Sequence, residues 1–140
     1  MNSRNIATAH ALKPILDEFC RVEDQALKSV RLIHEDGALS GIAFDFDQFS
    51  VTIEANANDD TVEISSRGVF ALDKAIGTDA TNVQPWAAVI GEPFGWGWVT
   101  VNQQGYCDGV LLSFRGITPQ FLLNAVASSI KVSTIEPQKR

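Results

Sequence analysis

The chain has 140 residues, the size of one typical domain, and its 45% of apolar residues can form a hydrophobic core without disulfides or metals. Its 17 acidic and 11 basic residues give a net charge of −6, which argues against binding to nucleic acids or to an anionic membrane surface, because both attract basic proteins. We therefore expect a single globular domain over residues 1–140 that binds neither nucleic acid nor membrane.

The first predicted element is a helix over residues 14–24. Pro14 suits the first position of a helix, where its missing N–H would have no partner in any case. Apolar residues then recur at helical spacing from Ile15 to Val22. The residues before Pro14 are also compatible with a helical turn, kinked at the proline.

Residues 26–34 are predicted to form a strand, and residues 40–65 a three-stranded antiparallel meander. In the first hairpin of the meander, apolar residues alternate strictly with polar ones. A two-residue loop at Asp47 and Gln48 would place all the apolar residues on one face. The pairs in that register are Phe46 with Phe49, Phe44 with Val51 and Ile42 with Ile53. The residues expected to be buried together are Ile42, Phe44, Phe46, Val51, Ile53, Val62 and Ile64.

The second half of the chain is less regular. Residues 66–85 lose periodicity and are expected to form a long connection, with a short helix near 71–76. The elements predicted after it are strands at about 94–101 and 109–115, a strand or helix over 120–126, and a closing strand around 130–135. The fold class that follows is α+β: an N-terminal helix packed on a mainly antiparallel meander sheet, for which strong curvature stays open.

The two cysteines, Cys20 and Cys107, lie far apart in the sequence and in no metal-binding or redox spacing. The N-terminal residues include no apolar stretch typical of a signal peptide, and no apolar run is long enough to cross a membrane. We therefore expect a cytoplasmic protein with both thiols free. Because Cys107 falls in a predicted polar loop, its thiol is expected to react before that of Cys20.

No catalytic or metal-binding pattern stands out. The two histidines, His10 and His34, lie near no nucleophile motif and are interpreted as structural. Asp45 and Asp47 are interpreted as the solvated face of a strand. The polar loop after Ala55 begins like a calcium-binding loop but lacks the glycine and the final glutamate that such loops need. We expect no catalytic residue, no metal site and no cofactor.

The segment from Trp96 to Gly109 is the most unusual part of the chain. Two tryptophans alternate with two glycines in one predicted strand, and glycine within a strand often marks the close approach of another chain or a ligand. The following loop is rich in amides, and its plainest interpretation is a hydrogen-bonded hairpin turn. The alternative is a recognition surface, for which the candidate binding residues are Trp96, Trp98, Asn102, Gln103, Gln104, Tyr106 and Asp108.

Two registers of this hairpin stay open. With a two-residue loop at Gln104 and Gly105, Val99 faces Val110 and both tryptophans lie on the outer face. A one-residue bulge exchanges the faces and turns both tryptophans into the core. Large apolar side chains are more often buried than exposed, which favours the bulged register.

Three features of the chain can be compared with known proteins: Trp96-x-Trp98, the sequence NQQGYxDG over 102–109, and Ile130-x-Val132 near the C-terminus. Together they resemble a family of small uncharacterised bacterial proteins, a domain of unknown function in which a tryptophan-rich strand precedes such a hairpin. The resemblance covers residues 38–135 and implies no activity and no catalytic residue, because the family has none assigned. The size and single-domain plan are also similar to those of immunity proteins of bacterial toxin systems, a likeness of architecture alone.

Three hypotheses follow. The first is a non-catalytic protein that binds another protein through the aromatic hairpin, as an accessory or immunity-like factor. The alternative is an enzyme or small-ligand binder with a pocket beside Gly95 and Gly97. Tyr106 and Asp108 would be the polar anchors of that pocket. The third is a subunit of a homodimer with no further role.

Overall fold

The computed structural model describes residues 9–69 and 77–136 of the chain, so the short helix expected near 71–76 lies outside the described residues. The elements in chain order are α1 (Ala9–Cys20), β1 (Ser29–Glu35), β2 (Ala38–Asp45), β3 (Phe49–Ala55), β4 (Val62–Gly68), β5 (Thr78–Asp79), the 3₁₀ helix η2 (Trp86–Val89), β6 (Phe94–Val101), β7 (Cys107–Phe114), β8 (Phe121–Val126) and β9 (Ser129–Thr134). No helix within the described residues is long and apolar enough to span a membrane.

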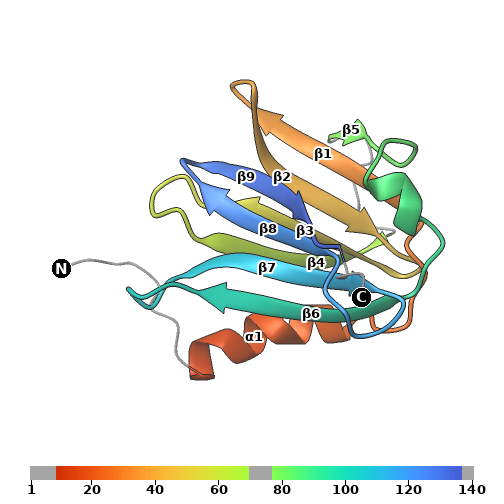
Figure 1. Cartoon of the computed structure of the whole chain (residues 1–140), viewed down its shortest axis with the longest axis horizontal. Helices are drawn as coiled ribbons and strands as arrows, with labels where there is room; N and C mark the ends of the chain where they lie inside the picture. The colour runs from red at the N-terminus through yellow and green to blue at the C-terminus, as the bar shows by residue number, and fades with distance from the viewer. Residues whose placement is uncertain (1–8, 70–76, 137–140) are drawn as a thin grey trace.

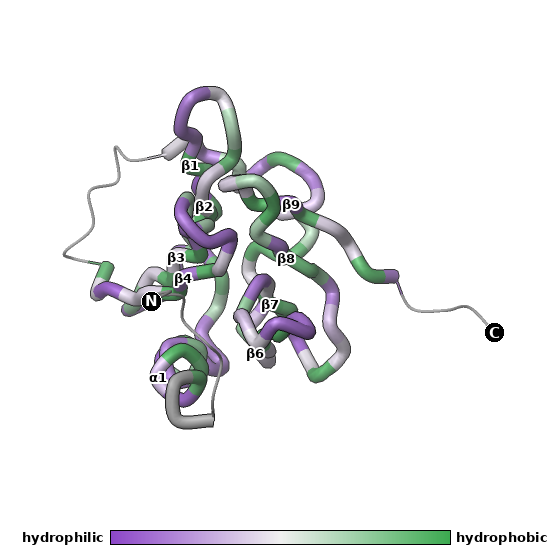
Figure 2. The backbone as a smooth tube through the Cα atoms, turned by 90° about the vertical axis from the view of Figure 1, so that its left-hand side faces the viewer, coloured by the Kyte–Doolittle hydropathy of each residue, from purple (hydrophilic) through white to green (hydrophobic). Residues whose placement is uncertain are grey.

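The strands form two antiparallel sheets that face each other. The first has the order β4-β3-β2-β1-β5 and the second the order β6-β7-β8-β9 (Figure 1). Figure 2 shows the sheets as adjacent layers, with α1 at one open end, where it contacts β4 and β6. The α+β class is confirmed, but the meander is one of two sheets, and neither is closed or strongly curved. Because each sheet buries its apolar face against the other, neither has to curl around a core of its own.

The boundaries of the helix differ from the predicted 14–24. α1 starts earlier, includes Pro14 and ends at Cys20. Beyond that point the backbone tightens, since the N–H groups of Val22 and Glu23 donate to carbonyls three residues back, at 3.2 and 3.5 Å. Val22 is completely buried in this turn, as it would be on the inner face of a helix. The apolar spacing therefore could not reveal where the helix ends.

The meander of the first sheet is confirmed in register. The observed contacts are the pairs Ile42 with Ile53 and Phe44 with Val51, and a hydrogen bond of 2.9 Å from the N–H of Phe46 to the carbonyl of Phe49. Six of the seven residues expected in its core are buried, and Ile64 is partly buried against them. The turn before β2 has positive φ at Asp36 and Gly37.

Two other strand predictions are resolved by the pairing. β1 spans Ser29–Glu35 and not 26–34, because Ala26 forms an isolated bridge to Pro93 instead. The segment predicted as a strand or helix over 120–126 is strand β8. It lies between β7 and β9, so the second sheet is also a meander.

In the second sheet, the middle of the β6–β7 hairpin has the register of the tight loop. The observed pairs are Val99 with Val110 and Gly97 with Leu112. A bulge at Gly95 does occur, but it precedes Trp96 and turns Phe94 into the core, where it is 3% exposed. The faces of the following residues are therefore not exchanged. The register with buried tryptophans is wrong for this reason, and Trp96 is 53% exposed.

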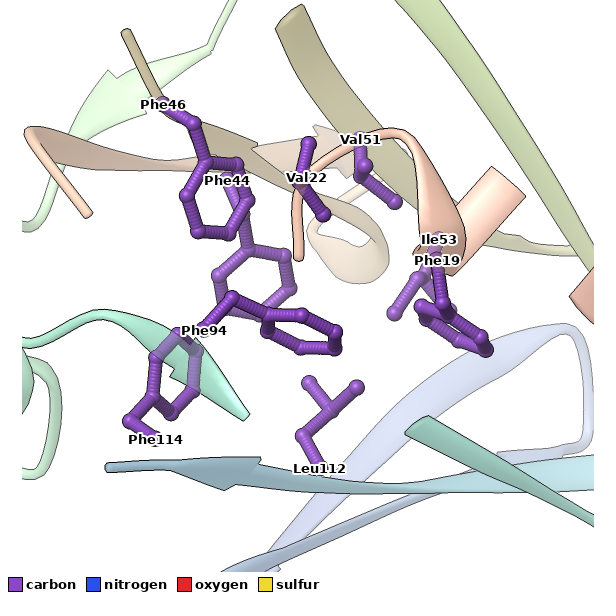
Figure 3. A pocket seen from close by; sticks show the side chains of 9 residues that line it. All are labelled: Phe19, Val22, Phe44, Phe46, Val51, Ile53, Phe94, Leu112 and Phe114. Atoms are coloured by element: carbon purple, nitrogen blue, oxygen red, sulfur yellow. The ribbon is translucent and has the colours of Figure 1, made fainter. Parts of the chain in front are cut away.

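The core lies between the two sheets and beside α1. Figure 3 shows side chains from α1 and from both sheets meeting there, with the rings of Phe19, Phe44, Phe94 and Phe114 close together. The rings of Phe19 and Phe94 stack with centroids 5.8 Å apart. The space between these side chains is about 10 Å³ and its lining is apolar, so it offers no room for a ligand.

The two cysteines are both free, but their environments are the reverse of the prediction. Cys107 begins β7 with its side chain in the core, and burial raises the pKa of its thiol above the ordinary value. Cys20 ends α1 and is exposed. The loop that was expected to expose Cys107 ends one residue earlier, at Tyr106. Cys20 is therefore the thiol that we now expect to react first.

Candidate functional site

Strand β6 places both candidate tryptophans on the outer face of the second sheet. Their indole rings stack on each other, with centroids 6.4 Å apart and planes inclined by 23°. Trp96 is more than half exposed, and Trp98 is half-buried. The stacked pair therefore presents an aromatic ridge to solvent.

Small residues hold the backbone of Trp96 in place. Its N–H donates to the hydroxyl of Ser113 at 2.9 Å, and this hydroxyl donates to the carbonyl of Gly116 at 2.7 Å. A Cβ atom on Gly95 would lie 2.1 Å from the same carbonyl oxygen, so only glycine fits at the bulge. The glycine beside the tryptophan is therefore needed for a close approach of two backbones within the hairpin.

Apolar residues continue from the tryptophans across the sheet. Trp98 lies opposite Leu111 on β7, and Leu111 lies opposite Leu122 on β8. Both leucines are partly exposed. Residues paired across neighbouring strands share a face, so these side chains form one apolar patch. We call Trp96, Trp98, Leu111 and Leu122 the tryptophan face.

The amide-rich loop after β6 is a turn held by its own hydrogen bonds. The side-chain oxygen of Asn102 accepts from the N–H groups of Gln104 and Tyr106, at 2.9 and 3.2 Å. Gly105 supplies a positive φ of 86°, and its N–H donates to the carbonyl of Asn102 at 2.9 Å. Asn102 is thus occupied in the turn, whereas Gln103 and Gln104 are exposed.

Asp108 is held by its neighbours within the hairpin. Its carboxylate accepts from the hydroxyl of Thr100 at 2.9 Å and from the side-chain amide of Asn102 at 3.5 Å, the outer limit for such a bond. The pairing of β6 with β7 skips Asp108, which is the extra residue of a second irregularity. These contacts tie the loop to β6 and give Asp108 a structural role.

A groove lies beside Gly95 and Gly97, as the alternative hypothesis requires. It has a volume of about 250 Å³ and is lined by Leu16, Phe19 and Cys20 of α1, by Glu23 in the turn after the helix, and by residues 94–97 of β6. Its lining does not include Tyr106 or Asp108, the two expected polar anchors. The groove is mainly apolar, with one carboxylate, so it resembles a binding surface more than a catalytic centre.

Sequence reasoning missed a buried polar cluster on the outer face of the first sheet. Asp45 is 7% exposed and accepts two hydrogen bonds of 2.9 Å from the guanidinium of Arg31. The hydroxyls of Ser29 and Ser50 donate to the same carboxylate at 2.7 and 2.8 Å. Burial alone would raise the pKa of Asp45, but these hydrogen bonds and the charge of Arg31 lower it below the ordinary value.

This cluster corrects the interpretation of Asp45 as a solvated residue. Both oxygens of the Asp45 carboxylate accept hydrogen bonds from donors within the protein, so the role of Asp45 is structural. The signal that could have found it is the pairing of β1 with β2, which places Ser29 opposite Asp45 and Arg31 two residues along. Asp47, by contrast, is more than half exposed, as expected.

Among the described residues, no three His, Cys, Asp or Glu side chains are grouped so as to hold a metal ion. His34 is exposed at the end of β1. The side chain of His10 lies outside the described part of the structure.

The geometry defines a two-sheet α+β protein with an apolar patch on one outer face. The chain belongs to the DUF6334 family, a family of unknown function whose model matches residues 12–139. No curated protein and no solved structure matches the chain significantly. The family match extends to both sides of residues 38–135, over which the hairpin resemblance was noted, and it assigns no activity.

Proposed function

We propose that the protein is a non-catalytic binding protein that holds another protein against its tryptophan face. The observation that carries the proposal is the stacked pair of Trp96 and Trp98 on the outer face of the second sheet. Tryptophan is among the residues most enriched in the few positions that dominate binding free energy in interfaces. Because the ring pair is already ordered, a partner would lose little conformational freedom of the tryptophans on binding.

The partner that we propose presents basic residues around an apolar centre. The chain has a net charge of −6, which favours encounter with a positively charged surface. Asp108 lies at the loop end of β6, and Glu23 lines the groove at its other end. Lysine and arginine side chains also bind to the faces of indole rings, so they suit both the charge and the aromatic ridge.

In the cell, we propose an accessory or immunity-like protein of the bacterial cytoplasm. The support for this setting is the hairpin resemblance, the small size and a binding surface without catalytic groups. An immunity protein acts by occupying its toxin, so it needs a surface and no chemistry. A toxin gene adjacent to the gene of this protein would support the setting, and a consistent lack of one among relatives would argue against it.

The test compares substitutions on and off the tryptophan face. We expect Trp96→Ala and Trp98→Ala to abolish capture of the partner from a lysate while the protein stays folded. Val83→Ala is the matched control, because Val83 is also exposed, at 54%, but lies outside the face. Retained capture by both tryptophan variants would refute the proposal. Light scattering over a dilution series tests the homodimer, which would appear as a mass that falls on dilution.

A small-ligand binder is the second candidate, favoured by the groove of about 250 Å³ beside Gly95 and Gly97. Screening a fragment library by NMR would test it. Saturable shifts at Leu16 and Gly97, without shifts on the tryptophan face, would favour this candidate over a protein partner.

A further inference from the structure

Strand β6 is the edge of its sheet and presents unpaired backbone groups. Among the described strands it pairs only with β7. The N–H of Trp96 donates to Ser113 on the β7 side, and the N–H of Asn102 donates to the carbonyl of Tyr106. Because backbone groups alternate in direction along a strand, those of Gly97, Val99 and Val101 point to the open edge. Within the described residues, no backbone hydrogen bond joins these three to another segment.

The open edge of β6 lacks the features by which proteins usually protect an edge. β6 contains no charged residue and no proline. The other long edge strands are charged: β4 carries Glu63 and Arg67, and β9 carries Lys131. Charges on an edge strand oppose pairing with another chain. The contrast indicates that β6 is left available for pairing.

The protein already pairs one of its own segments with the start of this edge. The N–H of Asp24 donates to the carbonyl of Phe94 at 3.0 Å, and the N–H of Phe94 donates to the carbonyl of Gln25 at 2.8 Å. Ala26 continues the contact as an antiparallel bridge to Pro93. The edge therefore accepts backbone hydrogen bonds from the segment after α1 at Phe94. Beyond the bulge at Gly95, the outward groups of Gly97, Val99 and Val101 have no backbone partner among the described residues.

The groove described above lies at the start of this edge, between α1 and residues 94–97 of β6. In Figure 1, β6 runs alongside α1, and Figure 2 shows the helix beside the end of the second sheet. Leu16, Phe19 and Cys20 of α1 line one side of the groove, and residues 94–97 of β6, Trp96 among them, line the other. A strand added to β6 would therefore have α1 behind it and the tryptophans beside it, so both of its faces would be covered.

We propose that β6 binds an extended peptide segment of its partner, in which apolar residues alternate with lysine or arginine, by strand addition. The inference rests on the proposed function, since it states how the partner meets the tryptophan face. The apolar residues of the segment pack toward Leu16 and Phe19 of α1. The basic residues lie on the opposite side, against the indoles of Trp96 and Trp98.

Charge favours a foreign basic segment over a second copy of the chain. The charged residue in the groove lining is Glu23, and Asp24 follows it at the same end. Pairing of two β6 strands would bring two chains of net charge −6 together and would supply no basic residue from β6 itself. A basic segment, in contrast, complements both the carboxylates and the ring faces.

The first experiment uses a capped eight-residue peptide of alternating valine and lysine, with amide hydrogen exchange of the intact protein as the readout. We expect exchange at Gly97 and Val99 to slow by about tenfold or more at saturating peptide. An alternating valine–glutamate peptide should bind about tenfold more weakly, and a form N-methylated at every backbone nitrogen should give no protection. Unchanged exchange at Gly97 and Val99 with the valine–lysine peptide would overturn the proposal. Protection that rises with protein concentration alone would replace it with a second copy.

The second experiment removes one donor from the edge. Val101→Pro deletes an outward N–H at a residue that is 45% exposed, and Val101→Ala shortens the same side chain but keeps the N–H. We expect the proline variant to bind the peptide about fivefold more weakly than the alanine variant, which corresponds to one hydrogen bond. Equal binding by the two folded variants would overturn strand addition. If the proline variant does not fold, the exchange of Gly97 and Val99 decides alone.

The two proposals fail in different ways. If Trp96→Ala abolishes capture of the partner while Gly97 and Val99 exchange at the same rate in the complex, the tryptophan face binds but strand addition is wrong. If both amides are protected and Trp96→Ala leaves capture unchanged, strand addition holds and the proposed role of the tryptophan face is wrong.

Discussion

The outer faces of the two sheets differ in how far their side chains find partners within the protein. On the first sheet, the buried carboxylate of Asp45 receives hydrogen bonds from Arg31, Ser29 and Ser50. On the second sheet, Trp96 and Trp98 stack on each other while much of their apolar area still contacts water. A face that supplies its own hydrogen bonds gains little from a partner, whereas an exposed apolar face gains free energy when it is covered. The comparison therefore favours the second sheet as the surface for the proposed partner.

The largest effect is expected from Asp45→Asn, which removes the charged carboxylate that accepts two hydrogen bonds from the buried guanidinium of Arg31. We expect the free energy of unfolding to fall by about 3–5 kcal/mol, as measured by urea denaturation. Asp47→Asn is the matched control, since Asp47 pairs with Lys28 at 3.2 Å with both side chains more than half exposed. The free energy of unfolding of Asp47→Asn should fall by less than about 1 kcal/mol. Similar losses of unfolding free energy for the two variants would show that the hydrogen bonds of Asp45 stabilise the protein no more than an exposed ion pair does.

Gly97→Ala tests the inner side of β6, which packs against α1, without changing the tryptophans on its outer face. A Cβ atom at Gly97 would lie 2.5 Å from the ring of Phe19, so α1 would have to move away from the sheet. We expect a loss of about 1–3 kcal/mol in the free energy of unfolding. Gly68→Ala on β4 is the control, since its nearest contact among the described residues would be at 3.9 Å. If Gly97→Ala were as mild as this control, α1 would not be pressed against β6 as the structure has it.

A smaller loss of stability is expected from Trp96→Ala. The residue is 53% exposed, so its removal should cost about 0.5–1.5 kcal/mol, chiefly the stacking on Trp98. Trp86→Ala is the matched control, because Trp86 is 3% exposed in the core and its loss should cost about 3–5 kcal/mol. Equal destabilisation in thermal and urea unfolding would make Trp96 part of the core and would remove the basis for a docking face.

The sequence could predict those elements whose pattern and turn agree. In the β2–β3 hairpin, strict alternation and a two-residue loop specify one register, and the pairing of Phe44 with Val51 confirms it. The helix end could not be predicted, because Val22 is buried equally well in a helix or in the tightened turn that it occupies. Local periodicity thus predicts which side chains are buried better than it predicts the backbone that buries them.

The candidate site was predicted in composition but not in orientation. The bulge at Gly95 depends on the carbonyl of Gly116, a contact across the hairpin that no local pattern encodes. Its position decides that Phe94 is buried and Trp96 is exposed. The burial of Asp45 likewise depends on Arg31 of a neighbouring strand. Both features arise from pairing between strands, which the alternation within one strand does not report.

The smallest effect is expected from Glu54→Gln. This variant tests whether every charged residue on the outer face of the first sheet lies in a favourable environment. Glu54 lies opposite Glu63 on β4. Partial burial raises the pKa of Glu54, and so do the negative charges of Glu63 and Glu35. This end of the face therefore carries an electrostatic conflict that the cluster around Asp45 does not.

The raised pKa of Glu54 fixes the sign of the effect. The folded protein holds this proton more tightly than the unfolded chain, so the stability that it contributes is present at low pH and is lost as the pH rises through the folded pKa. Asp45 has the opposite sign: its lowered pKa contributes stability above the ordinary aspartate range, and this is lost on acidification.

Glu54→Gln should therefore stabilise the protein at pH 7 by a few tenths of a kcal/mol, because the side chain is largely solvated. The gain should vanish below about pH 4, where glutamate is protonated in both states. Urea midpoints at both pH values, with Glu63→Gln as the partner variant that removes the same repulsion, would measure it. A loss of stability at pH 7 would show that the charge of Glu54 is favourable where it lies.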